Sequence, residues 1–189
     1  MTSRRNFLAF GLVPILAGIN ASTAMAQGKM VRPAPVPAGY RHVARLHGVP
    51  EDLLYAVALQ ESQMRFGQAA LPYPWTLNIR GAPKRFDSYR AAVATLAECL
   101  SNKILLVDCG LLQICWMYHH NRLRSPERAL DPYPNIAVGA QLLRHHFAQT
   151  GSWFRAVARY HNANPAIGDR YAASVYRHLG RIQSDRGAP

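Results

Sequence analysis

One carboxylate stands where the apolar face of a helix should continue, in the segment A-L-Q-E-S-Q at residues 58–63. Glu61 follows Val57 by four residues and Leu53 by eight, so it falls on the same helical face as these apolar side chains. Burial desolvates a carboxylate, which raises its pKa and keeps its proton near neutral pH. Such a group suits general-acid cleavage of a glycosidic bond. The alternative is that Glu61 ends its helix and turns to solvent or pairs with an arginine.

Three later segments place polar side chains among apolar ones. They are D-C-G-L-L-Q-I at residues 108–114, A-R-Y-H-N-A at 158–163 and R-Y-A-A-S-V at 170–175. A second acid, which most glycosidases use, is hard to identify. Asp108 is interpreted as a helix cap, and Asp87 and Asp131 stand at turns or helix starts. The sequence therefore offers Glu61 as a candidate for acid catalysis, without a clear second acid.

The elements that would position these residues are mainly helices. Pro50, followed by two acids, starts the helix that ends near Glu61. Further helices are predicted over 88–100, 111–120, 135–149, 153–161 and 169–179, with Ser88, Asn135 and Asp169 as caps. Residues 75–79 and 84–86 predict one small β-hairpin or extended excursion. We expect a mainly α fold in a single domain.

The first 26 residues have the pattern of an export signal. Arg4 and Arg5 precede a short apolar stretch at 7–19, and the tripeptide A-M-A that ends at Ala26 is a small-x-small cleavage site. The apolar stretch is too short to span a bilayer comfortably. The arginine pair followed by Phe-Leu favours a twin-arginine signal over an ordinary secretory one. We therefore expect cleavage near Ala26 and a periplasmic mature chain without a transmembrane segment.

The remaining chain divides into three parts. Residues 27–39 predict a Pro-rich linker, 40–182 the domain and 183–189 a polar tail. The net charge of +12 falls to +10 without the signal, which leaves 20 basic and 10 acidic residues. This balance favours an anionic partner or else reflects a solvated basic surface. Nucleic acid is not favoured, because the sequence has no zinc-finger spacing, RNA-binding motif or long basic run.

Three cysteines, Cys99, Cys109 and Cys115, allow at most one intramolecular disulfide and leave one thiol. An exported location permits such a bond, and the sequence does not decide the pairing. The alternative is three buried thiols, which is favoured if the chain folds in a reducing cytoplasm before export. No histidine or acidic spacing completes a metal site around them. The histidine pairs at 119–120 and 145–146 are interpreted as surface or core residues.

Taken in order, these segments resemble the soluble lytic transglycosylases, a branch of the goose-type-lysozyme-like fold. Glu61-Ser62 matches the E-S catalytic motif of that family, and G-L-L-Q-I at 110–114 matches its G-L-M-Q-I motif. Y-H-N-A at 160–163 looks like its Y-N-A-G, and Tyr171 matches the tyrosine that opens the last motif. The resemblance covers roughly residues 45–180. It implies a lysozyme-like domain that acts on peptidoglycan.

A closer resemblance is to transglycosylases of conjugative elements and of type IV secretion or pilus systems. It rests on L-P-Y-P-W-T-L-N-I-x-G, R-F-D-S, D-x-G-L-x-Q-I and L-D-P-Y-P-N-I-A-V-G-A, at residues 71–81, 85–88, 108–114 and 130–140. The chain departs from the family pattern at four positions. Leu112 replaces a methionine, and Cys115 stands where the subgroup often has asparagine. His161 interrupts the Y-N pair, and Asn164 stands near the position of the family glycine. Either His161 or Asn162 therefore supplies the polar contact expected of the Y-N-A-G motif.

The resemblance implies one catalytic acid and no metal or organic cofactor. Glu61 would protonate the glycosidic oxygen between N-acetylmuramic acid and N-acetylglucosamine, a β-1,4 linkage. The same residue would then act as base on the C6 hydroxyl of the muramoyl ring. That hydroxyl attacks C1 and leaves a 1,6-anhydro product, so no water is consumed.

Substrate binding is implied for the other matched positions, which are Ser62, Leu112, Gln113, Tyr160, Asn162 and Tyr171. A structural role competes at several of them: Ser62 could cap its helix, and Gln113 could be a buried amide. Tyrosines at helical spacing are more often core residues. Tyr73 and Trp75 would line a sugar groove or, in the interpretation we favour, pack the excursion.

Two other functions compete with this one. A hydrolytic muramidase on the same fold would use a second acid to place a water. A wall-binding assembly factor would need no catalysis and would tolerate Glu61→Gln. The expected partner is in each case the glycan strand of peptidoglycan, joined by components of a conjugation or secretion apparatus if the closer resemblance holds.

Overall fold

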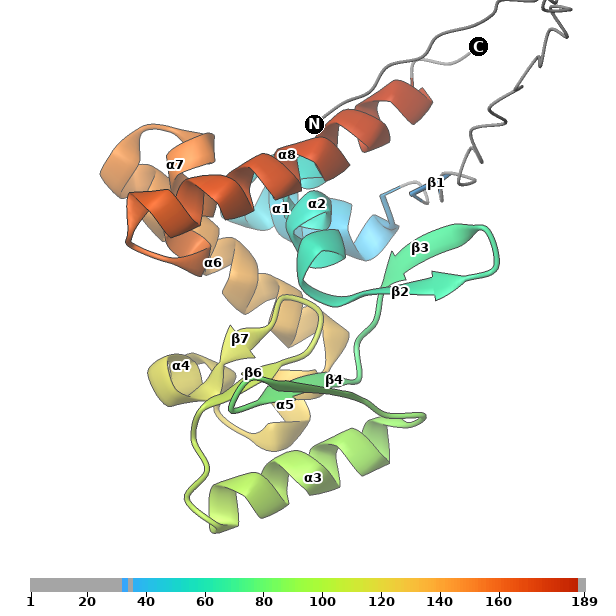
Figure 1. Ribbon diagram of the computed structural model, residues 1–189, viewed down its shortest axis with the longest axis vertical. Helices are drawn as coiled ribbons and strands as arrows, with labels where there is room; N and C mark the ends of the chain where they lie inside the picture. The colour runs from blue at the N-terminus through green and yellow to red at the C-terminus, as the bar shows by residue number, and fades with distance from the viewer. Residues whose placement is uncertain (1–31, 34–35, 187–189) are drawn as a thin grey trace, which may run out of the picture. The chain divides into compact units, whose positions relative to one another are not determined.

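The computed structural model describes residues 32–33 and 36–186, which form eight helices and seven short strands. The expected signal peptide lies outside these described residues. Figure 1 follows the chain from β1 in blue to α8 in red. The expected mainly α fold class is confirmed. Within the described ranges, no helix combines the length and apolar character that a membrane crossing needs.

Five helices pack together into the larger part of the domain. They are α1 (Ala38–His47), α2 (Glu51–Ser62), α6 (Pro132–Thr150), α7 (Trp153–His161) and α8 (Pro165–Arg186). Helix α2 contacts α1 and α8, while α6 contacts α1 and α7. Figure 1 shows α8 lying across α2 and α7, with α6 descending toward the strands. Helix α8 runs past both the expected end near residue 179 and the expected start of the polar tail at 183.

Helix α2 is the central helix of this group. Every residue from Leu53 to Leu59 is buried, so the expected one-sided apolar face is too narrow a description. Two acids in its first turn, Glu51 and Asp52, face the positive end of the helix dipole. Burying a large aliphatic side chain contributes about 1.5–3 kcal/mol, so this segment is firmly held. The last turn of α2, which carries Glu61, is therefore fixed by the core.

Two small sheets follow α2, where one hairpin was expected. The first pairs β1 (Arg32–Pro33) with β3 (Ala69–Pro72), and β3 with β2 (Gln63–Phe66). The hairpin β2–β3 was not predicted, because its strands are short, have no buried residue and lack an alternating pattern. Gly67 takes the positive φ of 57° that its turn requires.

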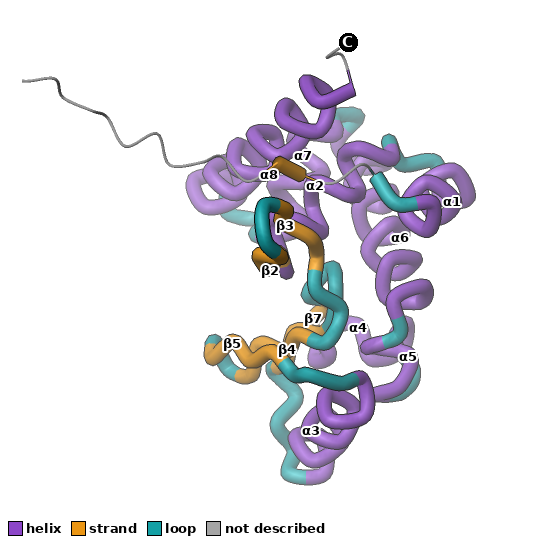
Figure 2. The backbone as a smooth tube through the Cα atoms, turned by 90° about the vertical axis from the view of Figure 1, so that its right-hand side faces the viewer, coloured by secondary structure: helices purple, strands orange, loops and turns teal. Residues whose placement is uncertain are grey.

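The second sheet has the order β5-β4-β6-β7 and is antiparallel throughout. Its strands are β4 (Thr76–Ile79), β5 (Ala82–Arg85), β6 (Val107–Cys109) and β7 (Ile114–Cys115). The expected hairpin corresponds to β4 and β5. Figure 2 shows this hairpin and β2–β3 on the same side of the domain. Strands β6 and β7 were expected to be a helix cap and a helix start.

Three further helices accompany the second sheet: α3 (Tyr89–Ser101), α4 (Trp116–Leu123) and α5 (Pro126–Leu130). The expected cap Ser88 is confirmed, since its hydroxyl accepts a hydrogen bond from the Ala91 N–H at 3.2 Å. Helix α4 begins at residue 116 rather than 111, because residues 110–113 form a turn.

Two expected caps are wrong. The side chain that caps α6 is Asp131, which accepts from the Tyr133 N–H at 3.0 Å, whereas Asn135 lies inside the helix and is buried. Asp169 lies inside α8 and pairs with Arg155 at 2.7 Å. Both helices begin at a proline upstream of the expected cap, Pro132 for α6 and Pro165 for α8, where the ring is preorganised for a first helical turn.

Candidate active site

A cavity of about 460 Å³ lies between the end of α2 and the second sheet. Its helical side is lined by Glu61, Tyr160 and His161, and its sheet side by Asp108 and Gln113. Residues as far apart in the sequence as Glu61 and His161 therefore share one surface.

Glu61 reaches the cavity from the last turn of α2 with a half-buried side chain. The hydroxyl of Tyr171, on α8, donates a short hydrogen bond to Glu61 Oε1. Burial raises the pKa of Glu61 from 4.5 to about 7, the hydrogen bond from Tyr171 lowers it, and the charge of Asp108 raises it. Glu61 thus exchanges a proton close to neutral pH, as the sequence predicted from its position in the helix.

Gln113 lies in a tight turn between β6 and β7. Its backbone has a positive φ of 45°, unusual for a residue with a side chain. The side-chain Nε2 donates to the Gly110 carbonyl at 2.8 Å and to the Thr76 carbonyl at 3.3 Å. Both bonds use the amide nitrogen, so the carbonyl oxygen is the group that can accept from a ligand in the cavity.

The neighbours of Gln113 anchor this turn to the helices. The Ser62 hydroxyl donates to the Leu111 carbonyl at 2.8 Å, and the Tyr160 hydroxyl donates to the Leu112 carbonyl at 2.6 Å. Ser62 and Leu112 are both buried and do not line the cavity. Both residues hold the turn from outside the cavity lining, and the substrate contacts expected of them stay predictions.

Asn135, which the sequence suggested only as a cap, holds the other side of the turn. Its Oδ1 accepts from the Leu112 N–H at 2.9 Å, and its Nδ2 donates to the carbonyls of Cys109 at 2.8 Å and Ala129 at 2.9 Å. Gly110 has φ +73°, and a Cβ at this position would lie 2.6 Å from Asn135 Nδ2. Glycine is required there both for its backbone conformation and for the close approach of the amide.

In the Y-H-N-A segment, the two candidates for a polar contact, His161 and Asn162, lie in different places. His161 lines the cavity, and its ring stacks on that of Tyr171 with centroids 4.3 Å apart and planes 4° apart. Asn162 lies outside the cavity, where its Oδ1 accepts from the Asn164 N–H at 2.8 Å in a local turn. Of the two residues, only His161 is placed to meet a ligand.

Asp108 is the cavity residue that the sequence interpretation missed. It lies in β6 rather than at a helix cap, and its Oδ2 accepts from Asn78 Nδ2 at 3.2 Å. Burial raises the pKa of Asp108, while hydrogen bonds from Cys115 and Asn78 lower it. The signal that could have revealed it is the Asp-x-Gly spacing, which fits a strand followed by a turn as well as a cap.

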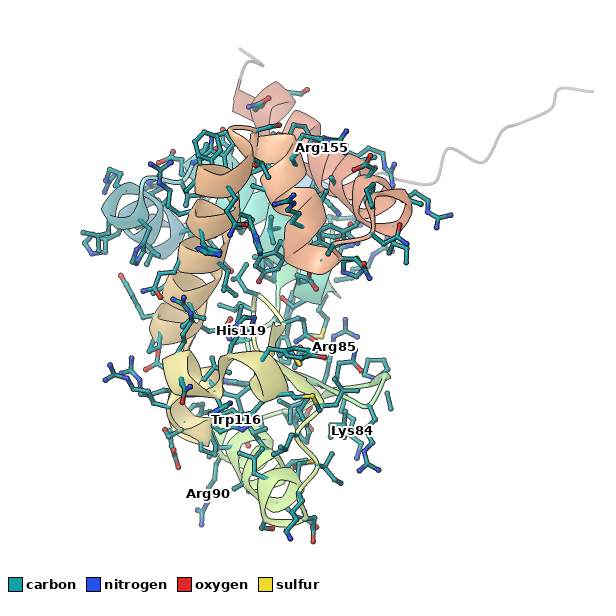
Figure 3. All side chains as sticks on the ribbon, turned by 90° about the vertical axis from the view of Figure 1, so that its left-hand side faces the viewer. Lys84, Arg85, Arg90, Trp116, His119 and Arg155 are labelled. Atoms are coloured by element: carbon teal, nitrogen blue, oxygen red, sulfur yellow. The ribbon has the colours of Figure 1, made fainter. Side chains whose placement is uncertain are left out.

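The ends of the cavity carry cationic or titratable side chains. Figure 3 shows Arg85 on the hairpin and His119 on α4, with Lys84 pointing away from Arg85. Both Arg85 and His119 line the cavity, as does His146 of α6. Arg85 also donates to the Gln63 carbonyl at 3.0 Å, which joins the hairpin to the residue after α2.

Tyr73 and Trp75 pack the excursion, as the sequence favoured. Their rings meet edge-on with centroids 5.8 Å apart, and the Tyr73 hydroxyl donates to the Phe86 carbonyl at 2.5 Å. Trp75 packs against the hydrophobic core. Neither residue lines the cavity.

Cys99, Cys109 and Cys115 are free thiols, the first two buried and the third at the cavity wall. Within the described part of the chain, no group of three or more His, Cys, Asp or Glu side chains is arranged to hold a metal ion. The polar groups of the cavity are therefore considered as acids, bases and hydrogen-bonding partners.

Comparison with protein families gives a match to the Transglycosylase SLT domain over residues 41–177. Comparisons with curated proteins and with solved structures gave no match. The matched range holds Glu61, the Gln113 turn and Tyr171, and it covers most of the chain. The chain therefore belongs to the transglycosylase SLT domain family and is a peptidoglycan lytic transglycosylase.

Proposed function

We propose that Glu61 is the acid and base of the reaction, and that the enzyme cleaves the β-1,4 bond between N-acetylmuramic acid and N-acetylglucosamine. The observation that carries the proposal is a carboxyl group with a pKa of about 7 in a 460 Å³ cavity, held by a tyrosine hydroxyl. A protonated Glu61 transfers its proton to the glycosidic oxygen as the bond to C1 breaks. The carboxylate then takes the proton of the muramoyl C6 hydroxyl as that oxygen attacks C1.

The surroundings of Glu61 suit both halves of this cycle. Burial favours the protonated form that donates to the leaving group, and the Tyr171 hydroxyl stabilises the carboxylate formed next. Because the pKa lies near neutrality, neither form is strongly disfavoured. One side chain can therefore serve as acid and then as base, and the product is a 1,6-anhydro sugar.

Substrate positioning is proposed for Gln113 and His161. The free carbonyl oxygen of Gln113 can accept from an acetamido N–H, while the imidazole of His161 can hydrogen-bond to a sugar hydroxyl or amide. Tyr160 already donates its proton to the Leu112 carbonyl, so its hydroxyl can only accept from substrate. Asn162 has no such role in this proposal.

A hydrolytic muramidase is the second candidate, and Asp108 is the observation that favours it. A hydrolase that inverts or retains configuration commonly uses two carboxylates. Asp108 and Glu61 line the same cavity, so the cavity contains the second carboxyl group that such a hydrolase needs. Product analysis distinguishes the two reactions, because hydrolysis adds a water that transglycosylation does not.

For the cellular setting we propose export to the periplasm and local opening of the wall for a conjugation or secretion apparatus. The support is the signal-like pattern of residues 1–26 and the subgroup motifs at 71–81 and 130–140. Two of these motif residues contribute to the site, since Asn78 bonds Asp108 and Asn135 holds the Gln113 turn. Labelling of the protein in intact cells, with and without Arg4→Lys and Arg5→Lys, tests the export route.

Rates of muropeptide release from purified sacculi test the proposed role of Glu61. We expect Glu61→Gln to lower kcat by about 10²–10⁴-fold while the protein still binds sacculi, since general acid catalysis contributes this much. Glu98→Gln, an exposed glutamate on α3, is the matched control and should behave as wild type. A Glu61→Gln protein that keeps its rate would refute the proposal. Absence of release by wild type and variant alike would favour an assembly factor.

A further inference from the structure

Asp108 lies in β6 at the cavity wall, where burial raises the pKa of its carboxyl group and two hydrogen bonds oppose that rise. Two side chains donate hydrogen bonds to it: the Asn78 amide from β4 at 3.2 Å and the Cys115 thiol from β7. Asp108 pairs in register with both residues across the sheet, so the donors are fixed by backbone pairing rather than by flexible side chains. Donors aimed at a carboxylate favour its charged form.

Glu61 lines the same cavity and is also buried, but it has fewer hydrogen-bond donors than Asp108. Its one hydrogen bond comes from Tyr171, and burial dominates over it. The negative charge of Asp108 makes a second negative charge on Glu61 more costly, so the proton of the pair resides on Glu61. Two carboxyl groups whose surroundings separate them in this way take different roles in one reaction.

We propose that Asp108 is a second functional carboxylate of this active site, which stays ionised, keeps the proton on Glu61 and stabilises the positive charge that develops on the sugar. The proposal rests on the function proposed for Glu61 and adds a residue to it. As Glu61 gives its proton to the glycosidic oxygen, the C1–O bond breaks and positive charge spreads over C1 and the ring oxygen. A fixed negative charge facing the cavity lowers the energy of that state. The C6 oxygen then bonds to C1, and its proton returns to Glu61.

Other groups that face the pair come from every wall of the cavity. Tyr160 and His161 of α7 and Tyr171 of α8 lie beside it. Burial lowers the pKa of His161, so this ring is mostly neutral at pH 7 and does not cancel the charge of Asp108. Arg85 faces the cavity from the hairpin and donates to the Gln63 carbonyl.

Two further histidines, His119 of α4 and His146 of α6, complete the titratable lining. Burial lowers the pKa of both rings. Among the described residues, the hydrogen bonds to Asp108 come from Asn78 and Cys115, and neither histidine donates one. The proposal therefore concerns the ionisation of Glu61 and Asp108, with Asp108 charged while Glu61 holds a proton.

The test is the pH dependence of kcat for Asp108→Asn on purified sacculi, beside Asp87→Asn as an exposed control. Asparagine keeps the shape and can still accept from Asn78, but it lacks the charge. We expect a bell-shaped profile for wild type, with Asp108 on the acidic limb and Glu61 on the alkaline limb. In Asp108→Asn, kcat should fall by about 10²-fold, the acidic limb should disappear and the alkaline limb should move to lower pH. KM should change little.

A second variant keeps the proposal testable if Asp108→Asn does not fold. Cys115→Ala removes one donor and leaves the carboxylate, so the acidic limb should move to higher pH while the alkaline limb stays in place. Unchanged limbs in a folded Asp108→Asn protein, or in Cys115→Ala, would overturn the proposal. So would a shift of Asp108→Asn from anhydro to hydrated products, because Asp108 would then govern water instead of charge. The proposed role of Glu61 is judged separately, by Glu61→Gln.

Discussion

Glu61 is subject to opposed influences that leave its proton balanced near neutral pH. Burial and the charge of Asp108 favour the acid, and the hydrogen bond from Tyr171 favours the carboxylate. A group that must donate a proton and then accept one benefits from such a balance. Changing either neighbour should therefore move the activity profile in a direction that can be stated beforehand.

Tyr171→Phe removes the hydroxyl that lowers the pKa of Glu61 and leaves the ring that stacks on His161. The pKa of Glu61 should rise, so the alkaline limb of the activity profile should move to higher pH. This is the opposite of the shift expected for Asp108→Asn. Because a hydrogen bond to a charged group contributes about 1.5–3 kcal/mol, kcat should fall roughly 10–100-fold. Tyr176→Phe, on the same helix, is the control, and an unshifted limb in Tyr171→Phe would contradict the assignment.

The raised pKa of Glu61 also predicts how stability depends on pH. The folded protein binds this proton with a pKa of about 7 and the unfolded chain with a pKa of 4.5, so the folded state holds more protons between these values. The free energy of unfolding therefore falls as pH rises through this window. Glu61→Gln should become more stable than wild type by at most about 3 kcal/mol at pH 8, reduced by solvent screening of a half-buried group.

Urea unfolding of wild type and Glu61→Gln at pH 4, 6 and 8 measures this effect. The stability difference at pH 8, referred to its value at pH 4, isolates the ionisation of Glu61 from other effects of the substitution. A difference that does not change with pH would show that the carboxyl titrates alike in the folded and unfolded states.

Helical spacing indicated a buried position for Glu61, because a helix fixes which side chains share a face. Tyr171 was selected by its match to the family motif instead. Asp108 was interpreted as a helix cap because its position depends on strands that meet only in the folded chain. Asp108 is explained by pairing of β6 with β4 and β7, which no local pattern reveals.

At the scale of elements, the turn that carries Gln113 was expected to be helical because G-L-L-Q-I is a short apolar run. The structure places it between two strands, with a positive φ at Gln113 that could not be predicted from the residue type. Long-range hydrogen bonds to Ser62, Tyr160 and Asn135 hold this conformation. The expected helices 88–100 and 153–161 were accurate because caps and periodicity are local signals.

Asn135→Ala tests how strongly the turn depends on α6. The change leaves the Leu112 N–H and the carbonyls of Cys109 and Ala129 without their buried partner. We expect a loss of about 3 kcal/mol in the free energy of unfolding, since each unsatisfied buried group is costly. Asn121→Ala, an exposed asparagine on α4, is the control for urea denaturation. Equal midpoints for the two variants would show that the turn is held without Asn135.

At the scale of the whole molecule, the chain is strongly basic, with 22 Lys and Arg against 10 Asp and Glu. Peptidoglycan carries carboxylates on its peptides, so the charge favours contact with the wall without specifying a site. The cavity that holds Glu61 is mixed in charge, since its lining includes Arg85 as well as Glu61 and Asp108. We therefore expect general attraction to the wall to be separable from recognition in the cavity.

Binding of Glu61→Gln to purified sacculi at increasing salt tests this division. Cleavage is suppressed in this variant, so the bound fraction reports binding alone. We expect the fraction to fall several-fold between about 0.05 and 0.5 M salt, over which charges on a surface become screened. Retention that does not depend on salt would mean that the basic charge has no part in holding the wall.

The most direct test of the central claim is mass spectrometry of muropeptides released from sacculi by the wild-type protein in H₂¹⁸O. Transglycosylation uses the C6 hydroxyl of the muramoyl ring as the nucleophile, so the products should lack one water and carry no ¹⁸O at C1. Glu61→Gln should release the same products about 10²–10⁴-fold more slowly. Hydrated products with ¹⁸O at C1 would contradict the account and establish a muramidase that activates water.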